Sequence, residues 1–315
     1  MWTLAEHLGG GGFGQVFRAF SDEGLLAAAK LVPKAPGAER ELLFEQLRDV
    51  PNVVPIIDLA ETDDAWVLVM PLADRSLADE LVQHGPLPLD QSVAVLIDVA
   101  TALAALEGNV VHRDLKPQNV LLLEGRWCLA DFGISRYAEA STAPDTRKFA
   151  MSWPYAAPER WRGERAAAAA DVYSFGVIAH EVLGGALPFS GPSEHEFREQ
   201  HLHTDPPTLQ NATTRLAGLI EECLFKAPQS RPTPTNLLAR LGKAGDVSRL
   251  PGASSLAAAN QAVVARTAGS AAAESRQRTE QERRAELATA AQAQLKAISA
   301  EFSTPLQRNS RRPYN

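Results

Sequence analysis

Two stretches decide the fold: Val111-His112-Arg113-Asp114-Leu115-Lys116-Pro117-Gln118-Asn119-Val120-Leu121-Leu122, and then Asp131-Phe132-Gly133. The first places Asp114, Lys116 and Asn119 within six residues, between a predicted helix and a predicted strand. Such a polar cluster has no structural purpose of its own. An isolated Asp-Phe-Gly is uninformative, but Asp131 follows Asp114 by 17 residues, and both stretches in this order are hard to obtain by chance. Together they predict a catalytic site.

A glycine-rich stretch lies near the start of the chain. Residues 9–16 read Gly-Gly-Gly-Gly-Phe-Gly-Gln-Val and fit the pattern G-x-G-x-x-G-x-V between two predicted strands. Gly9, Gly11 and Gly14 let the backbone approach phosphate groups and offer N–H donors without side-chain obstruction. Lys30 ends an apolar strand 16 residues after Gly14, where its ammonium group would neutralise phosphate charge under the loop. This pattern is weak alone and gains its meaning from the motifs that follow.

The hydrophobic pattern divides the chain into a strand-rich part, a larger helical part and a tail. Apolar and alternating runs predict strands at residues 2–8, 15–20, 25–32, 53–59 and 66–70, and a helix at 39–48. Longer periodic runs predict helices at residues 89–106, 171–183 and 214–225. After about Lys243 leucine and aromatic residues thin out, and residues 251–300 hold 17 alanines. We therefore expect a domain at 1–243 and an alanine-rich, partly helical or disordered tail at 244–315.

The composition argues against a nucleic-acid-binding protein. The net charge is −7; residues 1–243 carry −11 and residues 244–315 carry +4, so the tail is either solvated or docked on the acidic body. Cys128 and Cys223 lie in apolar surroundings, which is typical of buried free thiols in a reducing compartment. No stretch reaches 18 residues without a charge, and no basic-then-apolar leader begins the sequence. We expect a cytoplasmic protein without a membrane span.

These motifs resemble those of the eukaryotic-type (Hanks-type) serine/threonine protein kinase family over roughly residues 1–243. Later stretches agree: Tyr155-Ala156-Ala157-Pro158-Glu159, Asp171-Val172-Tyr173-Ser174-Phe175-Gly176 and Ser230-Arg231-Pro232. The resemblance implies an α+β, two-lobed protein kinase fold in a soluble bacterial member. A small antiparallel-sheet lobe with one helix would occupy about residues 1–73, and a larger helical lobe about residues 74–243.

The resemblance also implies how ATP is bound. Phosphoryl transfer depends mostly on positioning and charge stabilisation. The loop Gly9–Gly14 would cover the ATP phosphates and Lys30 would hold the α- and β-phosphates. Asn119 and Asp131 would supply the oxygen ligands of Mg²⁺, or of Mn²⁺ in its place. The adenine pocket would be formed by five residues: Val16, Ala28, Met70, Ala73 and Leu121.

Three residues would act on the acceptor. Asp114 would orient the substrate hydroxyl and accept its proton, and Lys116 would stabilise the γ-phosphoryl group in flight. Ser152 would take the place of the family's threonine that bonds to both of them. The motif His-Arg-Asp-Leu-Lys-Pro resembles the serine/threonine pattern rather than the tyrosine pattern, so the implied partners are proteins with serine or threonine acceptors.

The resemblance also bears on regulation and on the carboxylate partner of Lys30. Arg113 resembles the family arginine that binds a phosphate on the activation segment, where Thr146, and alternatively Thr142, is the expected autophosphorylation site. The family needs a carboxylate beside Lys30. The candidates are Glu39, Glu41 and Glu45. Family spacing favours Glu41, but helix geometry places Glu39 nearest the apolar face and Glu45 farthest from it, and we expect Glu39. The resemblance further implies a buried ion pair between Glu159 and Arg231.

Two other readings compete with an active kinase. A pseudokinase would bind nucleotide and act through its tail, but such proteins lose catalytic residues that are all present here: Lys30, Asp114, Asn119 and Asp131. A coiled-coil tail is the third reading. Only Leu295, Ile298 and Phe302 offer an apolar seam, and two turns cannot sustain a coiled coil.

Overall fold

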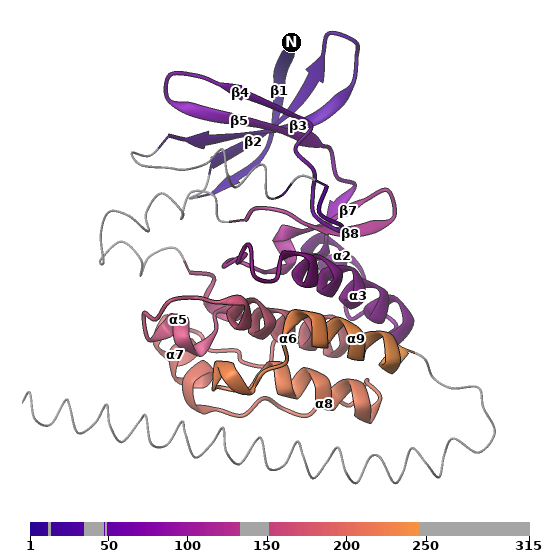
Figure 1. Cartoon of the computed structure of the whole chain (residues 1–315), viewed down its shortest axis with the longest axis vertical. Helices are drawn as coiled ribbons and strands as arrows, with labels where there is room; N and C mark the ends of the chain where they lie inside the picture. Colours follow the sequence, from indigo (N-terminus) through magenta and orange to yellow (C-terminus); the bar gives the residue numbers. More distant parts are fainter. Residues whose placement is uncertain (12–13, 35–46, 48, 133–150, 246–315) are drawn as a thin grey trace, which may run out of the picture.

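The computed structural model describes residues 1–11, 14–34, 47, 49–132 and 151–245. A sheet-rich small lobe sits on a larger helical lobe, and the chain crosses between them after β5 (Figure 1). The two-lobed α+β fold expected from the sequence is confirmed. The expected domain boundary at residue 243 and the nature of the tail stay predictions, because residues 246–315 lie outside the described part.

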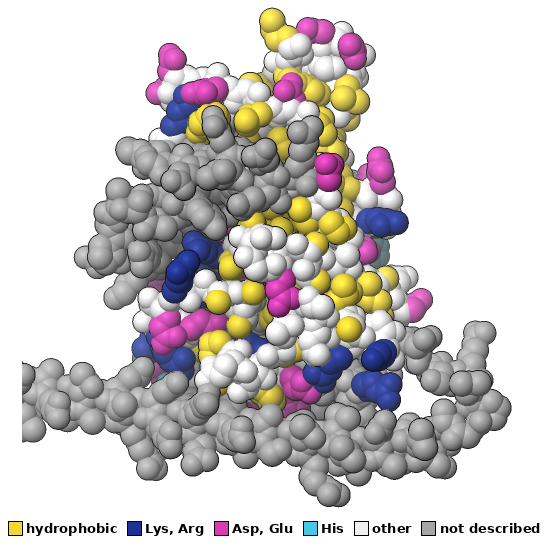
Figure 2. All heavy atoms as spheres, in the orientation of Figure 1, with side chains coloured by type: hydrophobic (Ala, Val, Ile, Leu, Met, Phe, Trp, Pro, Cys, Tyr) yellow, Lys and Arg dark blue, Asp and Glu magenta, His cyan; other side chains and the backbone are white. Residues whose placement is uncertain are grey.

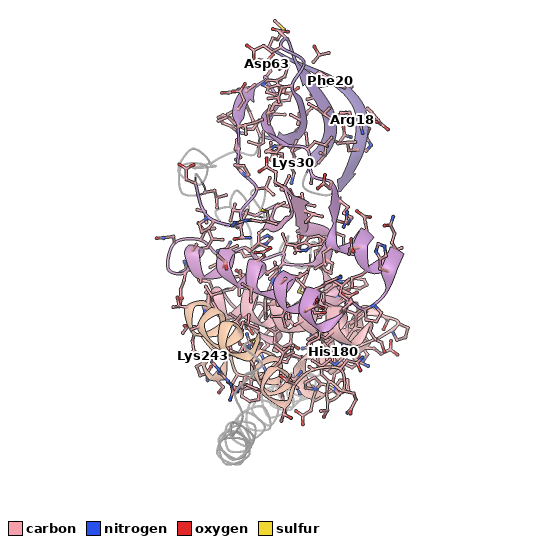
Figure 3. The ribbon with its side chains drawn as sticks, turned by 90° about the vertical axis from the view of Figure 1, so that its right-hand side faces the viewer. Arg18, Phe20, Lys30, Asp63, His180 and Lys243 are labelled. Atoms are coloured by element: carbon pink, nitrogen blue, oxygen red, sulfur yellow. The ribbon has the colours of Figure 1, made fainter. Side chains whose placement is uncertain are left out.

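The small lobe is a five-stranded antiparallel sheet in the order β1-β2-β3-β5-β4. Its strands are β1 (Trp2–Gly11), β2 (Gly14–Ser21), β3 (Leu26–Pro33), β4 (Asp58–Glu61) and β5 (Ala65–Pro71). The central strand β3 carries three successive alanines that are buried on both faces of the sheet, and Lys30 comes directly after them. Figure 3 shows Lys30 on the part of the small lobe nearest the helical lobe, whereas Arg18 and Phe20 lie on the outward side.

One predicted strand is wrong in extent. The sequence predicted a strand over residues 53–59, but β4 begins only at Asp58. The preceding residues pair with the other lobe instead: the Val54 amide donates to the Leu129 carbonyl at 2.9 Å, and the Leu129 amide donates to the Asn52 carbonyl at 2.8 Å. Pro55, which lacks an amide donor, interrupts the strand pattern between Val54 and β4. The predicted helix at 39–48 lies outside the described residues, apart from Leu47.

The large lobe consists of helices and a small sheet. Its helices are α2 (Leu77–His84), α3 (Leu89–Leu106), α5 (Pro158–Trp161), α6 (Ala168–Gly184), α7 (Glu194–His203), α8 (Thr214–Cys223) and α9 (Pro234–Gly245). Short 3₁₀ helices are η1 (Pro117–Asn119), η3 (Trp153–Tyr155) and η4 (Pro228–Ser230). The small sheet has the order β6-β7-β8, with β6 (Arg75–Ser76), β7 (Val120–Leu123) and β8 (Arg126–Leu129).

Local sequence explains where these helices begin and end. Ser76 and Asp79 form a capping box at the start of α2, and Thr213 caps α8 through the Leu216 amide. Gly185 ends α6 in the left-handed conformation at φ 72°. The helix predicted at 89–106 is confirmed at both ends, and α6 contains the helix predicted at 171–183.

The core of the large lobe is built around α6. Tyr173 and Phe175 of α6 are fully buried, and α6 contacts α3, α8 and α9. Both cysteines are buried free thiols, as the sequence predicted. Among the described helices, α3 alone is long and apolar enough to cross a membrane by length and composition. It packs against β8, α6 and α9, which is the position of a core helix.

Several large apolar side chains of the small lobe are exposed at its surface. Figure 2 shows hydrophobic side chains at the surface of this lobe, among acidic ones near its tip. Exposed large hydrophobic residues of this lobe include Leu4, Leu8, Phe20, Leu25, Leu26, Ile57 and Leu59. Singly exposed apolar side chains are normal on protein surfaces.

Candidate active site

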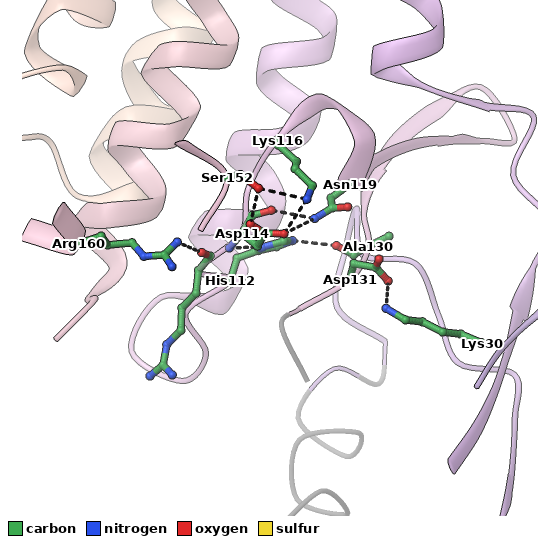
Figure 4. Close-up of polar contacts among 10 residues, drawn as sticks. Lys30, His112, Asp114, Lys116, Asn119, Ala130, Asp131, Ser152 and Arg160 are labelled. Atoms are coloured by element: carbon green, nitrogen blue, oxygen red, sulfur yellow. Dashed lines mark hydrogen bonds and ion pairs between the residues drawn. The ribbon is translucent and has the colours of Figure 1, made fainter. Parts of the chain in front are cut away.

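Asp114 is one corner of a triangle of side-chain contacts with Lys116 and Ser152 (Figure 4). Ser152 Oγ donates to Asp114 Oδ1 at 2.8 Å, and Lys116 Nζ donates to Asp114 Oδ2 at 2.9 Å. Lys116 Nζ also reaches Ser152 Oγ at 3.2 Å, which closes the triangle. Asp114 is only 4% exposed, so these contacts hold the buried carboxylate in one orientation. The expected contacts of Ser152 with the aspartate and the lysine are therefore present.

The backbone beside Asp114 is fixed by another buried carboxylate. Asp171, near the start of α6, accepts from the His112 amide at 2.7 Å and from the Arg113 amide at 2.8 Å. His112 Nε2 contacts the Ala130 carbonyl at 2.8 Å, which ties this loop to the segment that carries Asp131. Burial raises the pKa of the Asp171 carboxyl above its ordinary value, and the two amide donors oppose that effect.

Two oxygen-bearing side chains lie beside Asp114 and Lys30. Asn119 Nδ2 donates to the Asp114 carbonyl at 2.8 Å, which leaves Asn119 Oδ1 as an acceptor. Asp131 Oδ1 accepts from Lys30 Nζ at 2.5 Å, across the lobes. Arg113 and Asp131 both have positive φ angles, 68° and 59°, which non-glycine residues adopt only when their surroundings hold them there.

These donors fit a hard divalent cation. Carboxylate and amide oxygens are the ligand types that Mg²⁺ takes, and Mg²⁺ is bound through one or two carboxylates together with phosphate oxygens and water. In the described part of the chain no group of three or more His, Cys, Asp and Glu side chains could hold a metal ion alone. Asp131 and Asn119 therefore suit a cation that is shared with a phosphate ligand.

Strand pairing makes neighbours of some of the expected nucleotide-pocket residues. Val16 pairs with Lys30 between β2 and β3, and Ala28 pairs with Met70 between β3 and β5. Met70 and Leu121 pack against one small apolar cluster between the lobes, formed by Val54, Cys128 and Ala130. Ala73 follows β5 in the segment that joins the lobes.

The described residues of the glycine-rich stretch belong to the end of β1 and the start of β2. Gly9 pairs with Val16, and Gly11 pairs with Gly14. Gly14 has φ 125°, and a Cβ there would lie 2.2 Å from the Leu31 carbonyl oxygen. A side chain at this position would therefore collide with β3.

The predicted ion pair between Glu159 and Arg231 is confirmed. Arg231 Nη1 and Nη2 donate to Glu159 Oε1 and Oε2 at 2.7 and 2.8 Å, in the bidentate geometry of strong arginine–carboxylate pairs. Both residues are buried, and Arg231 also donates to the carbonyls of Phe225, Lys226 and Ala169. The pair joins the start of α5 to the segment before α9.

Four expected residues lie outside the described part of the chain: Glu39, Glu41, Thr142 and Thr146. Conversely, three described residues are more important to the site than the sequence indicated. The sequence motifs included Asp171 and His112 but gave them no role. Arg160, whose guanidinium donates to the Arg113 carbonyl, was not among the predicted site residues. An acid at the start of an otherwise apolar helix was the available signal for Asp171.

Comparisons with known proteins agree with this geometry. Residues 2–241 match the family described as protein kinase domain. The chain is 34% identical over 262 residues to the serine/threonine-protein kinase PkaA of Streptomyces coelicolor, covering 75% of this chain and 48% of that protein. It is 30% identical over 219 residues to the serine/threonine-protein kinase PrkC of Bacillus subtilis, covering 67% of this chain and 34% of that protein.

A third relative is the serine/threonine-protein kinase PkaB of Streptomyces coelicolor, 32% identical over 259 residues, with 76% of this chain and 62% of that protein covered. The chain thus spans about half the length of PkaA and about a third of PrkC. The family match extends through both lobes and includes each stretch that forms the site. This chain therefore belongs to the protein kinase domain family, and its relatives are bacterial serine/threonine-protein kinases.

Proposed function

We propose that this chain transfers the γ-phosphoryl group of ATP to serine or threonine hydroxyls of proteins. The contact between Ser152 Oγ and Asp114 Oδ1 at 2.8 Å carries the proposal. A carboxylate that accepts from one hydroxyl of its own chain is suited to accept from the hydroxyl of a substrate. The proton of the substrate hydroxyl passes to Asp114, and the oxygen of that hydroxyl attacks the γ-phosphorus. The bond from the γ-phosphorus to the β–γ bridging oxygen then breaks, and ADP leaves.

The cations of the site would balance the charge of the transferring group. Lys116, whose Nζ lies 2.9 Å from Asp114 Oδ2, would lie beside the acceptor hydroxyl and stabilise the γ-phosphoryl oxygens. Lys30, which is 5% exposed, would hold the α- and β-phosphates beside the glycine-rich stretch. A divalent metal, Mg²⁺ in this proposal and Mn²⁺ as its substitute, would neutralise phosphate charge from the oxygens of Asp131 and Asn119.

Cellular context and regulation are part of the same proposal. The domain would work in the cytoplasm, where ATP is supplied and where Cys128 and Cys223 stay reduced. Glu39 is proposed as the carboxylate partner of Lys30 during catalysis. Autophosphorylation on Thr146 or Thr142 would let Arg113 bind the new phosphate; mass spectrometry of protein incubated with ATP checks these two sites.

The test is phosphate transfer from labelled ATP and Mg²⁺ to a generic basic protein substrate. Asp114→Asn should abolish transfer while ATP binding persists, because this carboxylate acts on the acceptor. Asp131→Asn should instead weaken the binding of Mg·ATP. A wild-type chain that binds ATP without transferring phosphate would be a pseudokinase, and an active Asp114→Asn variant would remove Asp114 from its role as base.

A further inference from the structure

The peptide unit between Arg113 and Asp114 leads directly into the proposed catalytic base. Arg113 has φ 68°, in the left-handed region that a non-glycine residue keeps only where its surroundings hold it. A peptide unit is planar, and this one ends at the Cα atom of Asp114, so its orientation helps to set the direction in which the Asp114 side chain leaves the loop. Groups that hold this plane therefore also help to aim the carboxylate.

Three consecutive peptide planes of the catalytic loop are held by different partners (Figure 4). Asp171 of α6 holds the first two, because it accepts from the amides of His112 and Arg113. At one edge of the third plane the Asp114 amide donates to His112 Nδ1 at 3.3 Å, which is long for a hydrogen bond. At its other edge the Arg113 carbonyl accepts from the guanidinium of Arg160, and charge-assisted contacts are the stronger kind. Arg160 therefore supplies the stronger of these two restraints on the plane that leads into Asp114.

The helical turn that carries Arg160 is itself anchored. Arg160 follows Glu159 directly in α5, and Arg231 binds the Glu159 carboxylate with two hydrogen bonds of 2.7 and 2.8 Å. Successive side chains of a helix point about 100° apart, so one turn can direct Glu159 to Arg231 and Arg160 to the catalytic loop. Arg160 thus connects a buried ion pair of the large lobe with the backbone at Asp114.

The charge of Arg160 also acts on the carboxylate that holds the other two planes. Burial raises the pKa of Asp171, and the positive charge of Arg160 is among the influences that lower it again. A neutral side chain at position 160 would remove the restraint on the third plane. It would also weaken the ionised form of Asp171, which accepts from the two preceding amides.

We propose that Arg160 is a positioning residue for the catalytic base, which it orients from α5 through the Arg113 carbonyl. The inference rests on the proposed kinase activity. In that scheme Asp114 acts on the acceptor hydroxyl, whereas ATP is held by Lys30 and by the metal at Asp131. Loss of Arg160 should therefore lower kcat and leave the KM for ATP unchanged.

The experiment uses the full chain, labelled ATP with Mg²⁺, and a generic basic protein substrate. Arg160→Met keeps an unbranched side chain and removes both the donors and the charge, and we expect kcat to fall about tenfold. Arg160→Lys should recover most of the lost rate, because an ammonium group can still donate to the carbonyl. The matched control is Arg165→Met, at an exposed arginine five residues further on, which should behave as wild type.

A second measurement does not depend on activity. Amide hydrogen exchange, followed by mass spectrometry on peptides that cover residues 111–116, reports the local opening of these peptide planes. Arg160→Met should speed exchange there about tenfold, because it removes one charge-assisted contact. Exchange in α3 and α9, which lie away from this contact, should stay as in the wild type.

Two results would overturn the positioning role. One is a wild-type kcat, or wild-type exchange over residues 111–116, in Arg160→Met. The other is faster exchange throughout the large lobe together with weaker ATP binding, which would mean that Arg160 serves the fold as a whole. If Arg160→Met is insoluble, Arg160→Gln, which keeps an amide donor and loses the charge, is judged by the same two measurements. If the wild-type chain transfers no phosphate, the proposed kinase activity fails, and the exchange measurement alone decides the role of Arg160.

Discussion

Lys226 is a buried cation of the large lobe that contributes to the pH dependence of stability. It is 6% exposed, and its Nζ lies 3.3 Å from the Gln200 carbonyl and 4.3 Å from the centre of the Phe189 ring. The Asp205 carboxylate favours the charged form of Lys226, but the effect of burial is larger. Burial lowers the pKa of Lys226 from 10.5 to about 7, because the charged form is poorly solvated there.

The sign of the effect follows from proton binding. Between pH 7 and 10.5 the unfolded chain holds a proton on Lys226 that the folded chain lacks, so this group makes stability rise with pH across that window. Below pH 7 its full penalty is present. Lys226→Met removes the penalty, and its gain in melting temperature over wild type should be larger at pH 7 than at pH 9.5. Thermal melts at the two pH values measure this, and an equal gain at both would contradict it.

Single residues also show what the sequence could and could not predict. The polar residues of the catalytic loop were identified because Asp, Lys and Asn stand close together in the chain. The contact of Lys30 with Asp131 spans 101 positions, and the hydrogen bonds of Asp171 to the catalytic-loop backbone span 58 and 59. Such partners depend on how the lobes and helices pack, which local residue patterns do not encode.

At the scale of elements, α6 and α8 meet at a glycine. A Cβ on Gly176 of α6 would lie 2.9 Å from Cys223 Cβ and 3.0 Å from two side-chain carbons of Leu224. A helical glycine normally costs about 1 kcal/mol relative to alanine. Here the glycine lets the two helices approach each other. Packing therefore favours glycine at position 176, although helix propensity favours alanine.

Two glycine substitutions separate these effects. Gly176→Ala should lower the free energy of unfolding by about 1–3 kcal/mol, because overpacking outweighs the gain in helix propensity. Gly218→Ala in α8, where nothing lies within 4 Å of the new Cβ, should raise it by about 0.5–1 kcal/mol. Urea denaturation at equilibrium measures both. A stabilising Gly176→Ala would show that α6 and α8 can separate slightly at low cost.

Elements differed in how well the sequence predicted them. Helix α3 was predicted at both ends because its apolar positions recur over 18 residues. The strand predicted at residues 53–59 was wrong in extent, because Val53 and Val54 are not part of the small-lobe sheet. They pack between the lobes and Val53 bridges to Leu129, so their apolar character reflects burial rather than a place in the small-lobe sheet.

At the scale of the molecule, α9 is the last described element and completes the core of the large lobe. Helix α9 packs along α3, and its Leu237 and Leu241 are fully buried. Arg231, the last motif residue, is already paired with Glu159. Each part of the candidate active site therefore comes from residues before α9.

A chain truncated after Leu250 should accordingly keep its fold. We expect a melting temperature within about 2 °C of the full chain, a shift that corresponds to less than about 1 kcal/mol. The basal rate of phosphate transfer to a generic substrate should also be unchanged. An insoluble truncated protein, or a clearly lower melting point, would mean that the tail contributes to the core.

The contacts of Asp171 and Ser152 with the catalytic loop imply that this protein could be divided. They bridge the described residues on either side of positions 133–150: Asp171 holds the backbone at His112 and Arg113, and Ser152 bonds to Asp114. Apolar packing of α3 on α6 and α9 joins the same two parts. The fragments 1–140 and 141–250, co-expressed as two separate chains, should therefore associate into one complex, and Asp171→Ala should weaken their co-purification. Such a pair would give a kinase whose assembly is controlled by the concentration of its halves.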